Sequence, residues 1–130
     1  GKILMRQSSD SIKKLSFELG GNSPFIVFDD ADIKKAAKDA VSCKFRNSGQ
    51  TCVCANRIYV QEPIYDQFVA TFLEAVQALK VGNGFEEGVT QGPLIDQHAI
   101  DKMEAHVKDA LTHGAKLLTG GKRHALGAGF

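Results

Sequence analysis

The segment FRNSGQTCVCAN, residues 45–56, holds two cysteines, Cys52 and Cys54, with Arg46 six positions before the first of them. A lone cysteine is more often a small buried hydrophobic residue than a nucleophile. The neighbours of Cys52 favour reactivity, because Gly49 allows a sharp backbone turn and the two residues between them are polar. A nucleophilic thiol needs a base or a charged neighbour, and open backbone N–H groups to hold the charge that develops on the substrate oxygen.

Glu18 lies far upstream of the cysteines and is the candidate for the base. It stands between Phe17 and Leu19, and two glycines follow. A carboxylate at the end of a strand is usually solvated. Apolar neighbours favour the neutral form of a carboxylate, which suits a general base, provided that the fold brings Glu18 close to Cys52.

Arg46 is a candidate for binding a negatively charged part of a substrate. An arginine near a helix end is often solvated or interacts with the helix dipole. The planar guanidinium group also matches the geometry of a carboxylate. Because Arg46 lies in the same loop region as Cys52, it could hold a carboxylate at the far end of a molecule that reacts with the thiol.

The spacing of Cys52 and Cys54 allows two further interpretations. A soft metal could bind both thiols, but the four histidines lie far along the chain, so a closed zinc site lacks ligands and we predict no metal. In an extended segment the two Cα atoms would lie about 6.5–7 Å apart, at the limit for a disulfide. Such a disulfide would require a bend and would be easily reduced, as regulatory disulfides are. Cys54 is therefore either half of a redox switch or a residue that packs beneath the loop.

The composition is that of one soluble globular domain. The chain has 130 residues, of which 43% are hydrophobic and 24% are charged, with a net charge of +1. This balance gives no reason to expect nucleic acid or an anionic membrane surface as a partner. The apolar runs have the length of strands and are too short to span a bilayer. Three cysteines are an odd number, which argues against a disulfide framework and favours a reducing, intracellular setting, in the cytoplasm or the mitochondrial matrix.

Alternating strand and helix patterns predict an α/β fold with a mostly parallel sheet flanked by helices. The expected strands are Lys13–Leu19, Pro24–Phe28, Arg57–Gln61 and the segment 115–121; the expected helices are Ile33–Phe45, a long apolar stripe that follows Pro63, and the segment 96–114; the segment 81–93 is an expected loop. Working residues of parallel sheets lie beyond the carboxyl ends of the strands. The ELGG segment after the first expected strand, and NSGQTC after the first long helix, fit that rule.

FELGGNSP at residues 17–24, followed by FRNSGQTC at residues 45–52, resembles the aldehyde dehydrogenase superfamily. Glu18 and Cys52 stand 34 positions apart, and in that family the glutamate of ELGG and the cysteine of GQxC are the general base and the nucleophile. The resemblance continues through RIYVQ and VGNGFEEGVTQGPLI to GGKRH. Within the superfamily the segment CKFRNSGQTCVCAN, residues 43–56, is most similar to the succinate-semialdehyde dehydrogenase branch.

The resemblance implies an NAD- or NADP-dependent oxidation of succinate semialdehyde to succinate. The thiolate of Cys52 would attack the aldehyde, and Glu18 would activate the water that releases the acid from a thioester. Arg46 would hold the distal carboxylate of the substrate, and the backbone carbonyl of Leu19 would meet the nicotinamide amide.

The resemblance also implies that these 130 residues are one part of a catalytic domain. The nucleotide-binding half and the oligomerisation arm of the family are absent, and the parent protein is expected to be a homo-oligomer, a dimer or a tetramer. The isolated chain is not expected to bind NAD(P)⁺ or to turn over. Two alternatives remain: an aldehyde dehydrogenase for another ω-carboxy aldehyde such as glutarate semialdehyde, and a non-catalytic interaction protein with the same fold.

Overall fold

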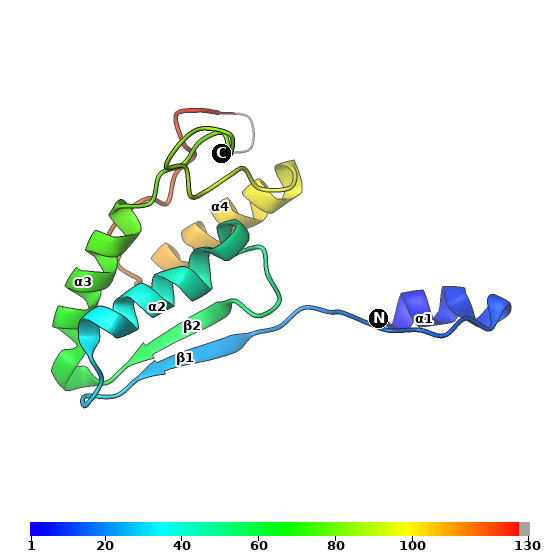
Figure 1. Cartoon of the computed structure of the whole chain (residues 1–130), viewed down its shortest axis with the longest axis horizontal. Coiled ribbons are helices and arrows are strands. Elements are labelled where there is room, and N and C mark those ends of the chain that lie inside the picture. The colour runs from blue at the N-terminus through cyan, green and yellow to red at the C-terminus, as the bar shows by residue number, and fades with distance from the viewer. Residues whose placement is uncertain (128–130) are drawn as a thin grey trace.

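Two parallel strands and the helix that connects them form the centre of the molecule. The computed structural model describes residues 1–127, in which strand β1 (Ser23–Val27) pairs with strand β2 (Ala55–Val60). Helix α2 (Ile33–Phe45) crosses from the end of β1 to the start of β2 (Figure 1). This β-α-β unit confirms the predicted α/β class and the parallel pairing.

Helix α2 has the bounds that the sequence predicts. Its first turn is capped by Asp32, whose carboxylate accepts a hydrogen bond of 3.1 Å from the N–H of Lys35. Ala37 and Ala40 are fully buried on the face that meets β1 and helix α3. Alanine has no side chain beyond Cβ, so the helix packs closely against its neighbours.

Helix α3 (Tyr65–Gln77) completes the core. It follows the 3₁₀ helix η3 (Glu62–Ile64), in which Pro63 occupies the first turn as expected. Phe68 is buried, and its ring stacks on that of Phe72 with the centroids 5.6 Å apart. Phe68 joins Val27 and the two alanines of α2 in one apolar cluster.

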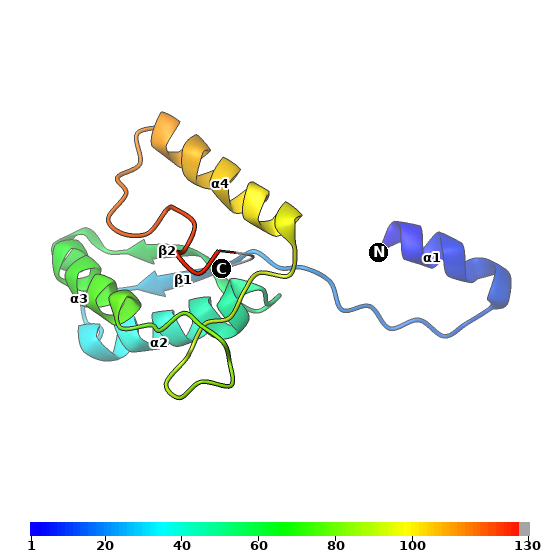
Figure 2. The same cartoon turned by 90° about the horizontal axis from the view of Figure 1, so that it is seen from above.

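The second half of the described chain is a loop followed by one long helix. The segment 81–93 is irregular, as predicted, apart from an isolated bridge between Val81 and Gln91. Helix α4 (Gln97–Thr112) is capped by Asp96, and Gly114 follows its end with a φ of 87°. Figure 2 shows α2 and α3 on one side of the sheet and α4 on the other.

Two predicted strands are wrong, and one helix was not predicted. Helix α1 (Lys2–Ser8) precedes the 3₁₀ helix η1 (Ser9–Ser11), and the chain then runs extended over residues 13–22 to reach β1. This stretch alternates polar and apolar residues, but no other strand lies beside it in the described part of the chain (Figure 1), and a strand exists only when its backbone groups pair. The segment 115–121 is also irregular, because Gly120 and Gly121 have positive φ angles that interrupt an extended chain.

No helix among residues 1–127 is long and apolar enough to cross a bilayer.

Candidate active site

The chain bends sharply around Cys52. The residues Thr51–Cys54, here called the cysteine turn, are closed by a hydrogen bond of 3.1 Å from the N–H of Cys54 to the carbonyl oxygen of Thr51. Cys52 occupies the second position of this turn and is exposed, whereas Cys54 is only 1% exposed. The turn therefore presents one thiol to solvent and buries the other.

The ELGG segment runs beside the cysteine turn. A Cβ atom added at Gly21 would collide with the carbonyl oxygen of Cys52, so the two backbones touch at a place that only glycine permits. One residue further on, the guanidinium of Arg57 donates a hydrogen bond of 2.8 Å to the carbonyl oxygen of Asn22. Glu18 lies three residues before Gly21. Its carboxylate is exposed, and it makes no hydrogen bond or ion pair in the described part of the chain.

Gly21 is a site residue that the sequence argument missed. The signal was present, because one of two consecutive glycines after a candidate base marks a place where another backbone can approach. In the structure this approach brings the ELGG segment, which carries the candidate base, against the cysteine turn. The condition placed on Glu18, that the fold bring its carboxylate near the Cys52 thiol, stays a prediction, because the contact lies three residues further on, at Gly21.

The sequence predicts that the candidate residues lie beyond the carboxyl ends of the strands, and this prediction is wrong. Both candidate groups precede their strands, because ELGG leads into β1 and the cysteine turn leads into β2. They therefore lie at the amino ends of these two strands. The physical reason is that the strand expected to end at ELGG does not form. At the opposite edge, the side chain of Gln61 accepts a hydrogen bond of 2.9 Å from the N–H of Asp29 and joins the two carboxyl ends.

Arg46 lies directly after the last residue of α2, and its backbone is fastened to the cysteine turn. Its carbonyl oxygen accepts a hydrogen bond of 3.2 Å from the Thr51 hydroxyl and a longer contact of 3.8 Å from the Cys54 thiol. The guanidinium group is exposed, and it makes no hydrogen bond or ion pair within residues 1–127. Arg46 lines a cavity of about 300 Å³ between the end of α2 and the loop that follows α3.

The third cysteine, Cys43, contacts the same turn from helix α2. The thiol of Cys43, in the last full turn of α2, lies 3.9 Å from the carbonyl oxygen of Val53. All three cysteines carry free thiols. Within the described part of the chain, no group of three or more His, Cys, Asp or Glu side chains gathers where it could hold a metal ion.

Leu19 is the residue that the resemblance assigns to the nicotinamide. Its side chain is 53% exposed, and its carbonyl oxygen accepts no hydrogen bond from the described residues. Its side chain lies against Gly1, at the start of α1, and an unpaired carbonyl is a suitable acceptor for an amide donor. The assignment of Leu19 to the nicotinamide stays a prediction from the resemblance.

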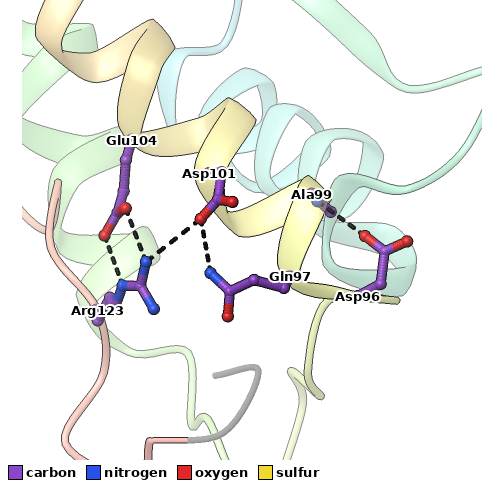
Figure 3. Close-up of polar contacts among 6 residues, drawn as sticks. All are labelled: Asp96, Gln97, Ala99, Asp101, Glu104 and Arg123. Carbon is purple, nitrogen blue, oxygen red and sulfur yellow. Dashed lines mark hydrogen bonds and ion pairs between the residues drawn. The ribbon is translucent and has the colours of Figure 1, made fainter.

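The pKa values that clearly depart from their usual range belong to a surface ion pair away from the cysteine turn. Arg123 donates two hydrogen bonds, of 2.6 and 2.8 Å, to the carboxylate of Glu104, and it also approaches Asp101 (Figure 3). These hydrogen bonds lower the pKa of Glu104 and raise that of Arg123. The pair fastens the irregular C-terminal segment to α4.

Comparison with known proteins identifies the family. The sequence model described as "Aldehyde dehydrogenase family" matches residues 1–130, the whole chain, and the chain therefore belongs to the aldehyde dehydrogenase family.

Among its relatives, the 3-sulfolactaldehyde dehydrogenase of Pseudomonas putida is 58% identical over 130 residues. The mitochondrial succinate-semialdehyde dehydrogenase of Oryza sativa subsp. japonica is 59% identical over the same length. A crystal structure of succinate-semialdehyde dehydrogenase from Burkholderia pseudomallei superposes with a TM-score of 0.93 at 57% identity over 99% of this chain. The chain spans only 25–27% of the length of these proteins.

Proposed function

We propose that this chain is part of an NAD(P)-dependent aldehyde dehydrogenase that oxidises succinate semialdehyde to succinate through a thioester on Cys52. The observation that carries the proposal is the contact of Gly21 with the carbonyl of Cys52, because it brings the segment of a candidate base against the turn of a candidate nucleophile. The exposure of Cys52 supports it, and so does the Glu18 carboxylate, which has no hydrogen-bond or ion-pair partner among residues 1–127. Both groups are free to act on a bound molecule.

In the proposed reaction the Cys52 thiolate attacks the aldehyde carbon and forms a carbon–sulfur bond, and the former carbonyl oxygen takes the negative charge. Backbone N–H groups of the turn that carries Cys52 are suited to stabilise that charge. The tetrahedral adduct then loses a hydride and becomes a thioester. NAD(P)⁺, when bound, supplies the acceptor for that hydride. Glu18 removes a proton from a water molecule, which attacks the thioester and releases the acid and the thiol.

Arg46 is proposed to bind the carboxylate at the far end of the substrate. Its guanidinium is exposed and unpaired in the described chain, while its backbone is tied to the cysteine turn, so substrate and nucleophile would be positioned from one loop. A substrate one methylene longer than succinate semialdehyde would present the same carboxylate to Arg46, so glutarate semialdehyde is the alternative substrate. The two relatives compared above are named for different aldehydes, so the family alone does not select the substrate.

The remaining parts of the proposal concern the full-length protein. We propose that the chain lies in the catalytic domain, that the nucleotide-binding half and the oligomerisation arm are encoded elsewhere in the protein, and that the protein is a homo-oligomer, a dimer or a tetramer. Leu19 is proposed to meet the nicotinamide amide. NAD and NADP share the nicotinamide group, so this contact does not distinguish them.

The proposal is tested in the full-length protein by replacing the two reacting groups one at a time. Cys52→Ala should abolish reduction of NAD(P)⁺ by succinate semialdehyde while NAD(P)⁺ still binds, measured by fluorescence titration. Glu18→Gln should retain a rapid first turnover of NAD(P)H and then stall, because the thioester forms but is not hydrolysed. Full turnover by Cys52→Ala would refute the nucleophile. A wild-type protein inactive on every aldehyde, under reducing conditions, would favour the non-catalytic alternative.

A further inference from the structure

The glutamine of the GQTC motif has contacts that the proposed reaction does not use. The side-chain oxygen of Gln50 accepts a hydrogen bond of 2.9 Å from the N–H of Ile95, which lies 45 residues away in the sequence. Its side-chain nitrogen donates a hydrogen bond of 3.2 Å to the carbonyl oxygen of Asn47. One side chain therefore joins two segments, the loop before the cysteine turn and the segment 92–95.

The backbone that Gln50 holds is strained. Asn47 and Ser48 have φ angles of 51° and 55°, in the left-handed region that residues other than glycine seldom occupy, and Gly49 follows with a φ of 80°. Two successive residues other than glycine in this region do not persist without support from their surroundings. The support is visible: Asn47 donates from its side chain to the carbonyl oxygen of Gln50 (3.1 Å), and the N–H of Gln50 returns to the carbonyl oxygen of Asn47 (3.1 Å).

A second contact ties the same loop to the same segment. The hydroxyl of Ser48 donates a hydrogen bond of 3.0 Å to the carbonyl oxygen of Gly92, and this contact is partly buried. The loop 46–50 is thus held at two points on the segment 92–95. The cysteine turn begins at the next residue, and Thr51 also reaches back to Arg46.

We propose that Gln50 is a positioning residue that fixes the cysteine turn, and with it Cys52 and Arg46, against the segment 92–95. This inference rests on the proposed function, because it assigns Gln50 a part in presenting the nucleophile. Gln50 need not touch the substrate. It acts through the strained loop, and a loop that relaxes would carry Cys52 away from its reactive position.

The test compares variants of the full-length protein. Gln50→Met keeps the size of the side chain but removes both hydrogen bonds, and Gln50→Glu keeps an acceptor for Ile95 but loses the donor to Asn47. The matched control is Gln61→Met, because Gln61 also accepts a hydrogen bond from a distant backbone N–H, at the opposite edge of the sheet. Each variant is first checked for an unchanged melting temperature and secondary structure.

Three measurements are made on each variant: amide hydrogen exchange at Ile95, the rate of iodoacetamide alkylation at Cys52 read by peptide mass spectrometry, and kcat. Gln50→Met should speed exchange at Ile95, slow alkylation several-fold, and lower kcat by about ten- to a hundred-fold, since small displacements of a reacting group have effects of this size. Gln50→Glu should lie between Gln50→Met and wild type in all three. Gln61→Met should match wild type in all three.

The inference would be overturned if Gln50→Met and Gln61→Met had the same rate of Cys52 alkylation and the same kcat. It would also be overturned if the lower alkylation rate and kcat of Gln50→Met were explained by a lower fraction of folded protein. The alkylation rate requires no turnover. An active Cys52→Ala protein would therefore refute the proposed reaction, while the alkylation comparison would still decide whether Gln50 positions the turn.

Discussion

At the scale of single residues, Arg46 is the group that would separate one aldehyde from another. We predict that Arg46→Ala lowers kcat/KM for succinate semialdehyde far more than for butanal, an uncharged aldehyde of the same length. Loss of a charge-assisted, two-point contact costs about 1.5–3 kcal/mol, or roughly ten- to two-hundred-fold. Steady-state kinetics on both substrates measures the difference.

Arg46→Lys is the informative control, because it keeps the charge but loses the planar fork. It should recover part of the activity on succinate semialdehyde. An equal fall in kcat/KM for both aldehydes would mean that Arg46 supports the loop and does not bind the substrate carboxylate. Its backbone contacts with Thr51 and Cys54 would then be its role.

Cys54 presents the second question at this scale. The segment is not extended, because Cys52 and Val53 form the middle of a turn, so the bend that a disulfide would require is already present. Against a switch, the Cys54 thiol is buried and directed at the carbonyl oxygen of Arg46, which fits the interpretation that it packs beneath the loop. A disulfide would require this thiol to turn away from Arg46.

If Cys54 is half of a redox switch, oxidation by peroxide links Cys52 to Cys54, and dithiothreitol restores activity. The comparison is between wild type and Cys54→Ala, with Cys43→Ala as a control for the third thiol. Wild type and Cys43→Ala should recover, while Cys54→Ala should not, because its unpartnered Cys52 proceeds to sulfinic acid. Equal recovery of all three proteins would exclude the switch.

At the scale of elements, Gly21 sets how closely the segment of the candidate base approaches that of the candidate nucleophile. We predict that Gly21→Ala destabilises the protein by about 1–3 kcal/mol, the usual cost of forcing atoms into a filled space, and lowers kcat. The added Cβ must displace the backbone of either the ELGG segment or the cysteine turn. Urea unfolding and steady-state kinetics measure the two effects.

The neighbouring glycine is the matched control. A Cβ added at Gly20 would meet no atom within 4 Å, so Gly20→Ala should remain close to wild type in both stability and kcat. If the two alanine variants behave alike, the contact between Gly21 and Cys52 does not hold the site together.

The elements also define what the sequence can predict. Helix α2 and strand β2 follow local signals: Asp32 caps the helix, an apolar face gives its period, and branched and aromatic residues mark the strand. The segment 13–19 carries an equally good strand pattern but forms no strand, because pairing depends on a partner that local pattern does not reveal. For the same reason the sequence did not predict at which edge of the sheet the candidate site residues lie. The ties from Gln50 to Ile95 and from Ser48 to Gly92 cross more than 40 residues and are invisible to any local pattern.

At the scale of the whole molecule, the chain exposes far more surface than its mass requires. The accessible area is 10160 Å² for 14.0 kDa, whereas a compact monomer of that mass exposes about 6,700 Å². Apolar side chains on α1 and on the face of the sheet opposite α2 contribute to the excess, including Ile3, Met5, Ile26 and Tyr59. Burial of these groups would have to come from contacts outside the 130 residues.

We therefore predict that residues 1–130, produced alone, bind a hydrophobic dye such as ANS, unfold over a broad range of urea concentration, and do not oxidise aldehydes. The full-length protein in the same buffer should unfold cooperatively and should not bind the dye. Sharp unfolding together with turnover by the isolated chain would contradict this expectation.

The crossover through α2 also limits how the length of this chain can vary. Glu18 and Cys52 each precede one of two neighbouring parallel strands, so most of their separation of 34 positions consists of one strand, one helix and the connections around them. Parallel neighbours cannot be joined by a tight hairpin, so this separation cannot become much shorter. A residue inserted within α2 would rotate all that follows by about 100° and displace Cys52 relative to Glu18. The connection at residues 28–31 lies at the far edge of the sheet, and homologous sequences should accept insertions there while they preserve the length of the helix.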